Sequence, residues 1–124
     1  MRISRKKFED AVDRALEKIP GMFHAHLNNI TIAVENRPSK DLVREMNLPP
    51  GEMLFGVFTG VPLPERSVTE PPLYPDAILI FMEPLMTACR SREELEEEIA
   101  TTVMHELAHY LGLSEERLEE LGYD

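Results

Sequence analysis

The sequence predicts an α+β fold in which a short mixed sheet packs against an N-terminal helix and a long helix near the C-terminus. Three observations carry this prediction. Apolar residues recur at helical spacing in two segments, one at each end of the chain. Between them lie three short runs rich in apolar and β-branched residues, which is typical of strands. A chain of 124 residues is one domain by the usual length prior, so residues 1–124 are expected to share a single core.

The N-terminal helix is expected to begin after Ser4 and to run to about Lys18. Ser4 is a residue that caps helix N-termini well. A stripe of apolar side chains follows at helical spacing and includes Phe8 and Val12. The helix is expected to stop at residues 20–21, where proline is followed by glycine.

Three strands are expected, over residues 29–35, 53–59 and 76–82. The first alternates apolar and polar residues, and the third is almost entirely apolar and bounded by prolines. Gly56 in the second indicates a bulge or a close approach of another segment. Residues 39–46 fit a short helix, and the proline-rich residues 60–76 fit an ordered surface loop within one domain.

The long helix is expected to begin after Ser91, because Ser91 and Glu94 have the spacing of a capping box. Apolar residues then recur every four positions, and small or flexible residues widen the stripe. Gly112 is placed to end the helix in a left-handed conformation. Ser114 can cap a last short helix through Leu121.

The long helix carries the pattern H-E-x-x-H at residues 105–109. Histidines four residues apart lie on one face of a helix, so the imidazoles of His105 and His109 can bind one metal ion. Zinc accepts neutral imidazole readily, and a catalytic zinc site keeps one position open for water. Glu106 is placed to act as a general base on that water.

A catalytic zinc site needs a third protein ligand, and the sequence after His109 offers glutamates for this role. A chain reversal at Gly112 can bring Glu115 back toward the two histidines. Glu116 and Glu119 are the alternatives. Glu115 also fits the first turn of the next helix, where an acidic side chain is favourable without any metal.

Five other residues that bear chemistry are expected to be structural. Cys89 is expected to be a buried or half-buried residue without reactivity. His24 and His26 fit one face of a strand, but such a pair is more often an ordinary surface feature. Tyr110 has a hydroxyl that can stabilise an oxyanion, as does Tyr123, and each is more often an aromatic residue at the edge of the core.

The charge balance excludes some classes of partner. Acidic residues outnumber lysine and arginine by 23 to 13, for a net charge of −10. This charge argues against binding to nucleic acid or to an anionic membrane surface. A single cysteine, together with a basic N-terminal segment that lacks an apolar stretch, predicts a cytoplasmic protein without a secretory signal. The sequence does not indicate an oligomeric state.

The segment HELAHYLGLSEERLEELG, preceded by DAILIF and EELEEEIATTVM, resembles the small bacterial zincin-like metallopeptidase family of minimal, metzincin-like single domains. The family pattern is H-E-x-x-H-x-x-G-x-x-acid, and the final acid is often aspartate. The resemblance implies that His105, His109 and Glu115 bind Zn²⁺ and that Glu106 is the base. Glutamate at position 115 is one methylene longer than the usual aspartate, and no methionine of a Met-turn follows the motif.

The resulting hypothesis is a zinc-dependent peptidase acting on a peptide or protein substrate. An edge strand, with residues 76–82 as the candidate, would align an extended substrate by main-chain hydrogen bonds. Two alternatives remain open. A metal-dependent endoribonuclease can also use histidines around such a helix, although it does not need Glu106. A noncatalytic interaction module would keep zinc only for stability.

Overall fold

The secondary structure follows the local signals in the sequence closely. A computed structural model of the chain describes residues 1–60 and 76–123. The predicted surface loop of residues 60–76 falls almost entirely on residues 61–75, outside the described residues. In chain order the elements are α1 (Arg5–Lys18), η1 (Gly21–Phe23), α2 (His24–Leu27), β1 (Thr31–Glu35), α3 (Lys40–Met46), β2 (Gly56–Thr59), β3 (Ala77–Phe81), α4 (Met82–Ala88), α5 (Arg92–Leu111) and α6 (Glu115–Glu120).

Serine caps begin four of these helices. The hydroxyl of Ser4, Ser39, Ser91 or Ser114 accepts a hydrogen bond from a main-chain N–H three residues later, at the start of α1, α3, α5 and α6 respectively. These bonds satisfy N–H groups that a helix leaves unpaired in its first turn. In a capping box the glutamate also accepts a hydrogen bond from the main-chain N–H of the capping serine. At α5 this second bond is shifted by one residue, and Glu94 accepts from the N–H of Arg90 at 3.3 Å.

The sheet has the strand order β1-β3-β2. β1 pairs with β3 in parallel, and β2 pairs with β3 antiparallel, so the predicted mixed sheet is confirmed. The expectation that residues 76–82 form an edge strand is wrong, because β3 lies in the centre. Its nearly continuous apolar run suits a strand with little exposure on either face, and all its residues are buried or half-buried. β2 is instead the antiparallel edge strand.

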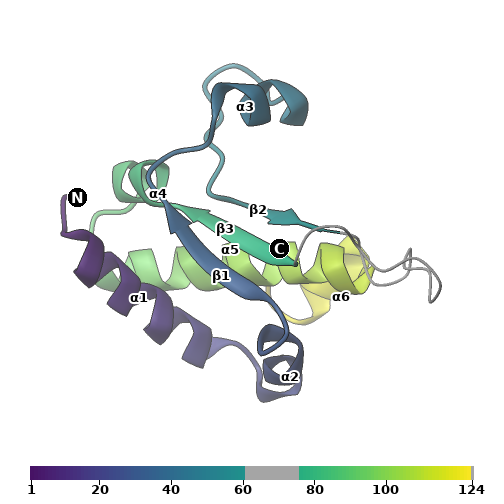
Figure 1. The fold of residues 1–124 in the computed structure, drawn as a ribbon. Helices are drawn as coiled ribbons and strands as arrows, with labels where there is room; N and C mark the ends of the chain where they lie inside the picture. Colours follow the sequence, from purple (N-terminus) through teal and green to yellow (C-terminus); the bar gives the residue numbers. More distant parts are fainter. Residues whose placement is uncertain (61–75, 124) are drawn as a thin grey trace.

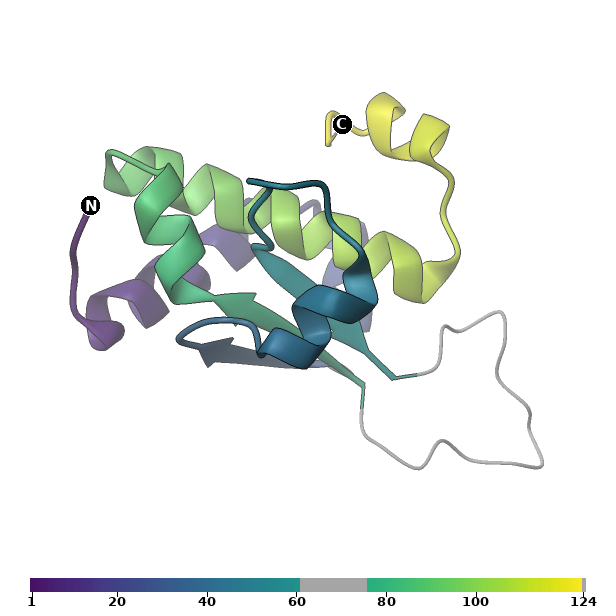
Figure 2. The same ribbon diagram turned by 90° about the horizontal axis from the view of Figure 1, so that it is seen from above.

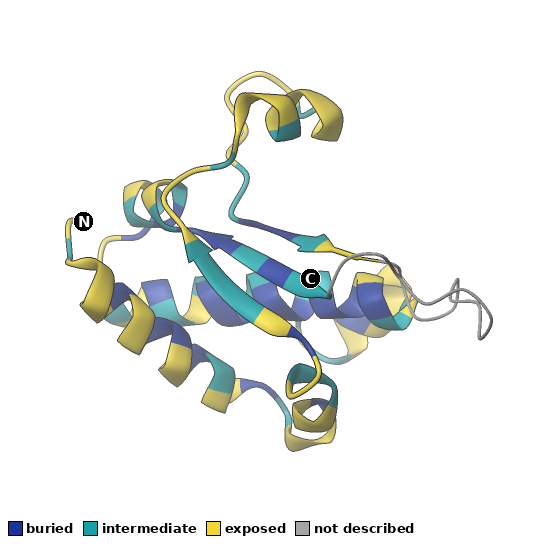
Figure 3. Cartoon of the chain, in the orientation of Figure 1, coloured by how far each residue is buried: buried dark blue, intermediate teal, exposed yellow. Residues whose placement is uncertain are grey.

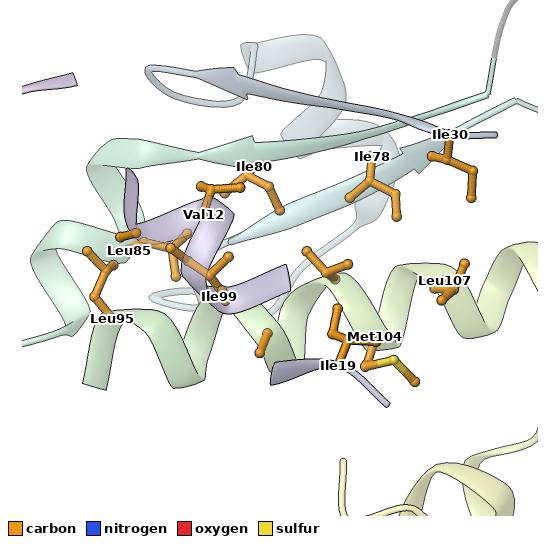
Figure 4. Packing of buried hydrophobic residues seen from close by; sticks show 14 of the residues in the cluster. Val12, Ile19, Ile30, Ile78, Ile80, Leu85, Leu95, Ile99, Met104 and Leu107 are labelled. Carbon is orange, nitrogen blue, oxygen red and sulfur yellow. The ribbon is translucent and has the colours of Figure 1, made fainter. Parts of the chain in front are cut away.

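One face of the sheet is covered by α1 and α5, which also pack against each other (Figures 1 and 2). Ile78 and Ile80 of β3 point from this face toward Ile99, Met104 and Leu107 of α5 (Figure 4). Figure 3 shows the buried residues along this interface, and α3 on the other side of the sheet is mostly exposed. The arrangement is the α+β layer expected from the sequence.

Two elements differ from the sequence-based expectation. No helix is expected directly after the third strand, yet α4 follows β3 at once and contains Pro84 as its third residue. Proline is tolerated there because the N–H groups of the first turn have no helical partner. His24 and His26 lie in the helix α2 and not on a strand, so they do not share a strand face. His24 Nε2 lies 2.8 Å from the carbonyl oxygen of Ile19.

Candidate metal centre

α5 carries the histidine pair near its C-terminal end. The helix is fixed against the core by a stripe of buried side chains, Leu95, Ile99, Ala100, Val103, Met104, Leu107, Ala108 and Tyr110. His105 and His109 lie beside this stripe. His105 is half-buried, and the side chain of His109 is 58% exposed. The pair therefore sits at the boundary between core and solvent, where a metal ion and a substrate can both reach it.

Glu106 turns inward between this helix and the sheet. Only 14% of its side chain is exposed, and its Oε1 lies 3.7 Å from Nδ1 of His109. The same oxygen accepts a hydrogen bond of 2.8 Å from the main-chain N–H of Phe58 in β2. Burial raises the pKa of Glu106 above its ordinary value, while the Phe58 N–H and the two imidazoles oppose this rise. The carboxylate is thus held beside the histidine pair by a neighbouring strand.

α5 ends at Gly112, as predicted. Its φ of 73° is left-handed, which glycine adopts without steric cost. The N–H of Gly112 bonds to the carbonyl of His109, and the N–H of Leu113 bonds to that of Ala108. These two bonds make a Schellman motif, which reverses the chain immediately after the histidines.

α6 follows this reversal and carries the three candidate acidic ligands. Glu115 is its first residue, and Glu115, Glu116 and Glu119 are all exposed. Leu118 is buried and anchors the helix on the core. Within residues 1–60 and 76–123, no three histidine, cysteine, aspartate or glutamate side chains come together in a group that could hold a metal ion. The structure therefore does not bring Glu115 into one cluster with His105 and His109.

The donor chemistry of the α5 pair nevertheless suits zinc. Two imidazoles at i and i+4 would provide two of the three protein ligands that a catalytic zinc site uses. A nonligating carboxylate beside them is the further group that hydrolysis at such a site requires. The cysteine-rich donor sets of closed structural zinc sites are not available, because Cys89 is the only cysteine of the chain and is buried.

The remaining candidates have structural surroundings. Cys89 is buried, as expected, and burial raises the pKa of its thiol to about 11, with smaller contributions from the charges of Glu94 and Glu98. Tyr110 is buried, and its ring lies 5.5 Å from that of Phe58 at an interplanar angle of 51°. Tyr123 is partly buried against the core.

Sequence reasoning missed Phe58. The group that matters is its main-chain N–H, which is the same in every residue except proline. The contact also joins positions 48 residues apart. Only the register of β2 against β3, which no local pattern encodes, could have directed attention to it.

Comparison with known proteins gives a family for the chain. The family described as zincin-like metallopeptidase matches residues 27–123, which include β1, β2, β3, α5 and α6. No curated protein matches the chain. None of the helices in the part of the chain that the structure describes is long and apolar enough to cross a membrane.

Proposed function

The chain belongs to the zincin-like metallopeptidase family, and from this premise we propose that it hydrolyses peptide bonds at the end of α5. Members of this family depend on Zn²⁺. The observation that carries the proposal is the position of the Glu106 side chain. It is only 14% exposed, and its Oε1 lies 3.7 Å from Nδ1 of His109. A zinc site that served stability alone would not need a carboxylate held in this place.

The roles of the residues follow from their positions. His105 and His109 would hold the metal through their imidazole nitrogens. Bound zinc supplies polarisation of the peptide carbonyl and a water of lowered pKa. Glu106 takes the proton from the attacking water and passes it to the leaving amine.

Glu115 remains our proposal for the third ligand. It lies three residues before Leu118, and residues at this spacing share one side of a helix. Because Leu118 is buried, this side of α6 is turned toward the body of the protein, whereas Glu116 lies off it. A shift of the first turn of α6 toward His109 would complete the ligand set.

The edge of β2 is the place where an extended substrate would bind. In the antiparallel register, Phe55 is paired with Phe81 through an N–H···O bond of 2.9 Å, so odd-numbered residues of this segment bond to β3. The main-chain groups of Gly56 and Phe58 then point to the outer edge, where Gly56 is buried and Phe58 is half-buried. A peptide or protein segment in extended form can pair there by strand addition.

The test is metal analysis of protein purified without added metal, combined with cleavage of fluorescein-labelled casein. We expect one zinc per chain in the parent and in Glu106→Gln, and none in His105→Ala. Casein cleavage should fall by about 10²–10⁴-fold in Glu106→Gln, since this variant keeps the site but lacks the base. A parent without bound metal would contradict the proposal.

The same variants separate the alternative functions. Cleavage of RNA but not casein would favour the endoribonuclease, which the net charge of −10 makes a poor fit. A noncatalytic module predicts that Glu106→Gln changes no property, while chelation of zinc lowers the Tm. The cytoplasmic location also remains a proposal, supported by the single cysteine.

The third ligand is tested by comparing zinc affinity in three matched variants of α6. Glu115→Ala should weaken zinc binding at least about tenfold, as expected for the loss of a direct ligand. Glu116→Ala and Glu119→Ala remove the same charge from the same helix and should leave the affinity nearly unchanged. An equal loss in all three would indicate a general charge effect and would contradict ligation by Glu115.

A further inference from the structure

The main-chain N–H of Phe58, which contacts Glu106, takes no part in the hydrogen bonding between β2 and β3. Phe58 is opposite Ile78 in the antiparallel register, and its N–H points away from β3. At the outer edge this N–H would ordinarily be bonded to water. It donates instead to Oε1 of Glu106 at 2.8 Å, the length of a hydrogen bond to a charged acceptor.

Two neighbouring features fix β2 against α5 at this point. A Cβ atom on Gly56 would lie 2.7 Å from Cγ2 of Thr102, so the absence of a side chain lets the strand approach the helix closely. The ring of Phe58 packs on Tyr110. Tyr110 lies one turn beyond Glu106, so Phe58 contacts two residues on the same face of α5.

We propose that the main-chain N–H of Phe58 positions the catalytic carboxylate of Glu106. This inference rests on the proposed function for the identity of Glu106 as the base. The N–H holds Oε1 and thereby fixes the rotation of the carboxylate, which leaves Oε2 to receive the proton. A base held in one orientation by a rigid strand does not lose rotational freedom during the reaction.

The proposal also says which groups of the edge serve the substrate. The Phe58 N–H belongs to the enzyme's own hydrogen bonding and Gly56 is buried, so an extended peptide would pair with the carbonyl of the half-buried Phe58. The opposing view is that substrate binding takes the Phe58 N–H away from Glu106. These two views differ in their effect on kcat and KM.

Amide hydrogen exchange measured by NMR tests the contact without metal or substrate. In the metal-free parent we expect the Phe58 amide to be protected although it faces the outer edge. Glu106→Ala should lower its protection about tenfold or more, because a bond to a charged acceptor is lost. Glu97→Ala is the matched control, since it removes an exposed glutamate from the same helix and should leave the Phe58 amide unchanged.

The Leu79 amide reports on the sheet itself. Leu79 is opposite Val57, at a position where the two strands bond to each other, so its protection should be the same in all variants. Loss of protection at both Phe58 and Leu79 in Glu106→Ala would mean that β2 had detached, and an unprotected Phe58 amide in the parent would mean that the bond is absent. Either result would overturn the proposal.

Kinetics on zinc-loaded protein with fluorescein-labelled casein test the positioning role. Phe58→Pro removes the N–H at an edge position where proline is tolerated, and Phe58→Ala removes the ring but keeps the N–H. Relative to Phe58→Ala, Phe58→Pro should lower kcat at least about tenfold with unchanged KM and zinc content. A raised KM with unchanged kcat would overturn the proposal. A protected Phe58 amide in a zinc-loaded parent that cleaves no peptide would contradict the peptidase function alone.

Discussion

Gly56→Ala tests how closely β2 lies against α5. Gly56 does not have a left-handed φ, so the cost of the new methyl group comes from lack of space alone. The Cβ atom would lie 2.7 Å from Cγ2 of Thr102 and 2.9 Å from the main-chain oxygen of Leu79. The threonine methyl can shift a little, but the carbonyl belongs to the central strand. Overpacking of this kind costs about 1–3 kcal/mol.

This cost converts into a measurable shift of the Tm. An unfolding entropy of about 2.1 cal/mol/K per residue means that each kcal/mol lowers the Tm of a 124-residue chain by about 4 °C. Gly56→Ala should therefore melt roughly 4–12 °C below the parent in a circular dichroism scan. It should also lower the exchange protection of the Phe58 amide, since the methyl group pushes β2 away from Glu106.

Two further variants make the result specific. Gly21→Ala is the matched control, because nothing lies within 4 Å of its Cβ position and its φ is not left-handed. Its Tm should stay within about 2 °C of the parent. Adding Thr102→Ser to Gly56→Ala removes Cγ2 but keeps the hydroxyl that bonds to the Glu98 carbonyl, and should recover part of the loss. Equal Tm values for Gly56→Ala and Gly21→Ala would refute the close approach.

Three other predictions concern α5 and its surroundings. Gly112→Ala should lower stability by about 1–2 kcal/mol, measured by urea unfolding, because alanine would have to adopt a left-handed φ of 73°; an unchanged midpoint would contradict this. Ser91→Ala should cost about 1 kcal/mol in the same assay, since the N–H of Glu94 loses its 3.1 Å bond to the serine hydroxyl. The raised pKa of Cys89 means that the folded state favours the neutral thiol. The resulting contribution to stability is fully present below pH 9.0, the ordinary pKa of the thiol, and is lost as the pH rises through about 11. Iodoacetamide at pH 8 should accordingly alkylate Cys89 only slowly until urea unfolds the chain, and rapid alkylation of the folded protein would show that the thiol is accessible.

Features with a local physical cause were predictable from the sequence. A serine hydroxyl can satisfy an N–H only a few residues away, so Ser91 and Ser114 mark their helix starts without knowledge of the fold. The role of Gly112 as the end of α5 is predictable for a similar reason, because a helix needs a left-handed residue only at the position directly after its last turn. The i and i+4 spacing of His105 and His109 is likewise a property of the helix itself.

Features that depend on strand pairing were not predictable in the same way. The sequence indicated that residues 76–82 form a strand but not that the strand is central, because an apolar run reports burial of the two faces and not the neighbours at the edges. By its sequence Pro84 bounds the third strand, whereas in the structure it lies in the first turn of α4. The choice of the strand that aligns the substrate depends on strand order. Because β3 is central and β2 lies at an edge, β2 replaces residues 76–82 in this proposed role.

The position of β2 also explains why the histidine motif alone describes the site incompletely. The motif fixes where Glu106 lies along α5, but a glutamate on a helix has several rotamers available. Gly56 and the Phe58 ring bring the outer edge of β2 to the helix, and the Phe58 N–H then favours one orientation of the carboxylate. The same edge carries the carbonyl of the half-buried Phe58, with which an extended peptide would pair. One short strand would thus set both the orientation of the base and the line of the substrate, and a displacement of β2 should impair the two together.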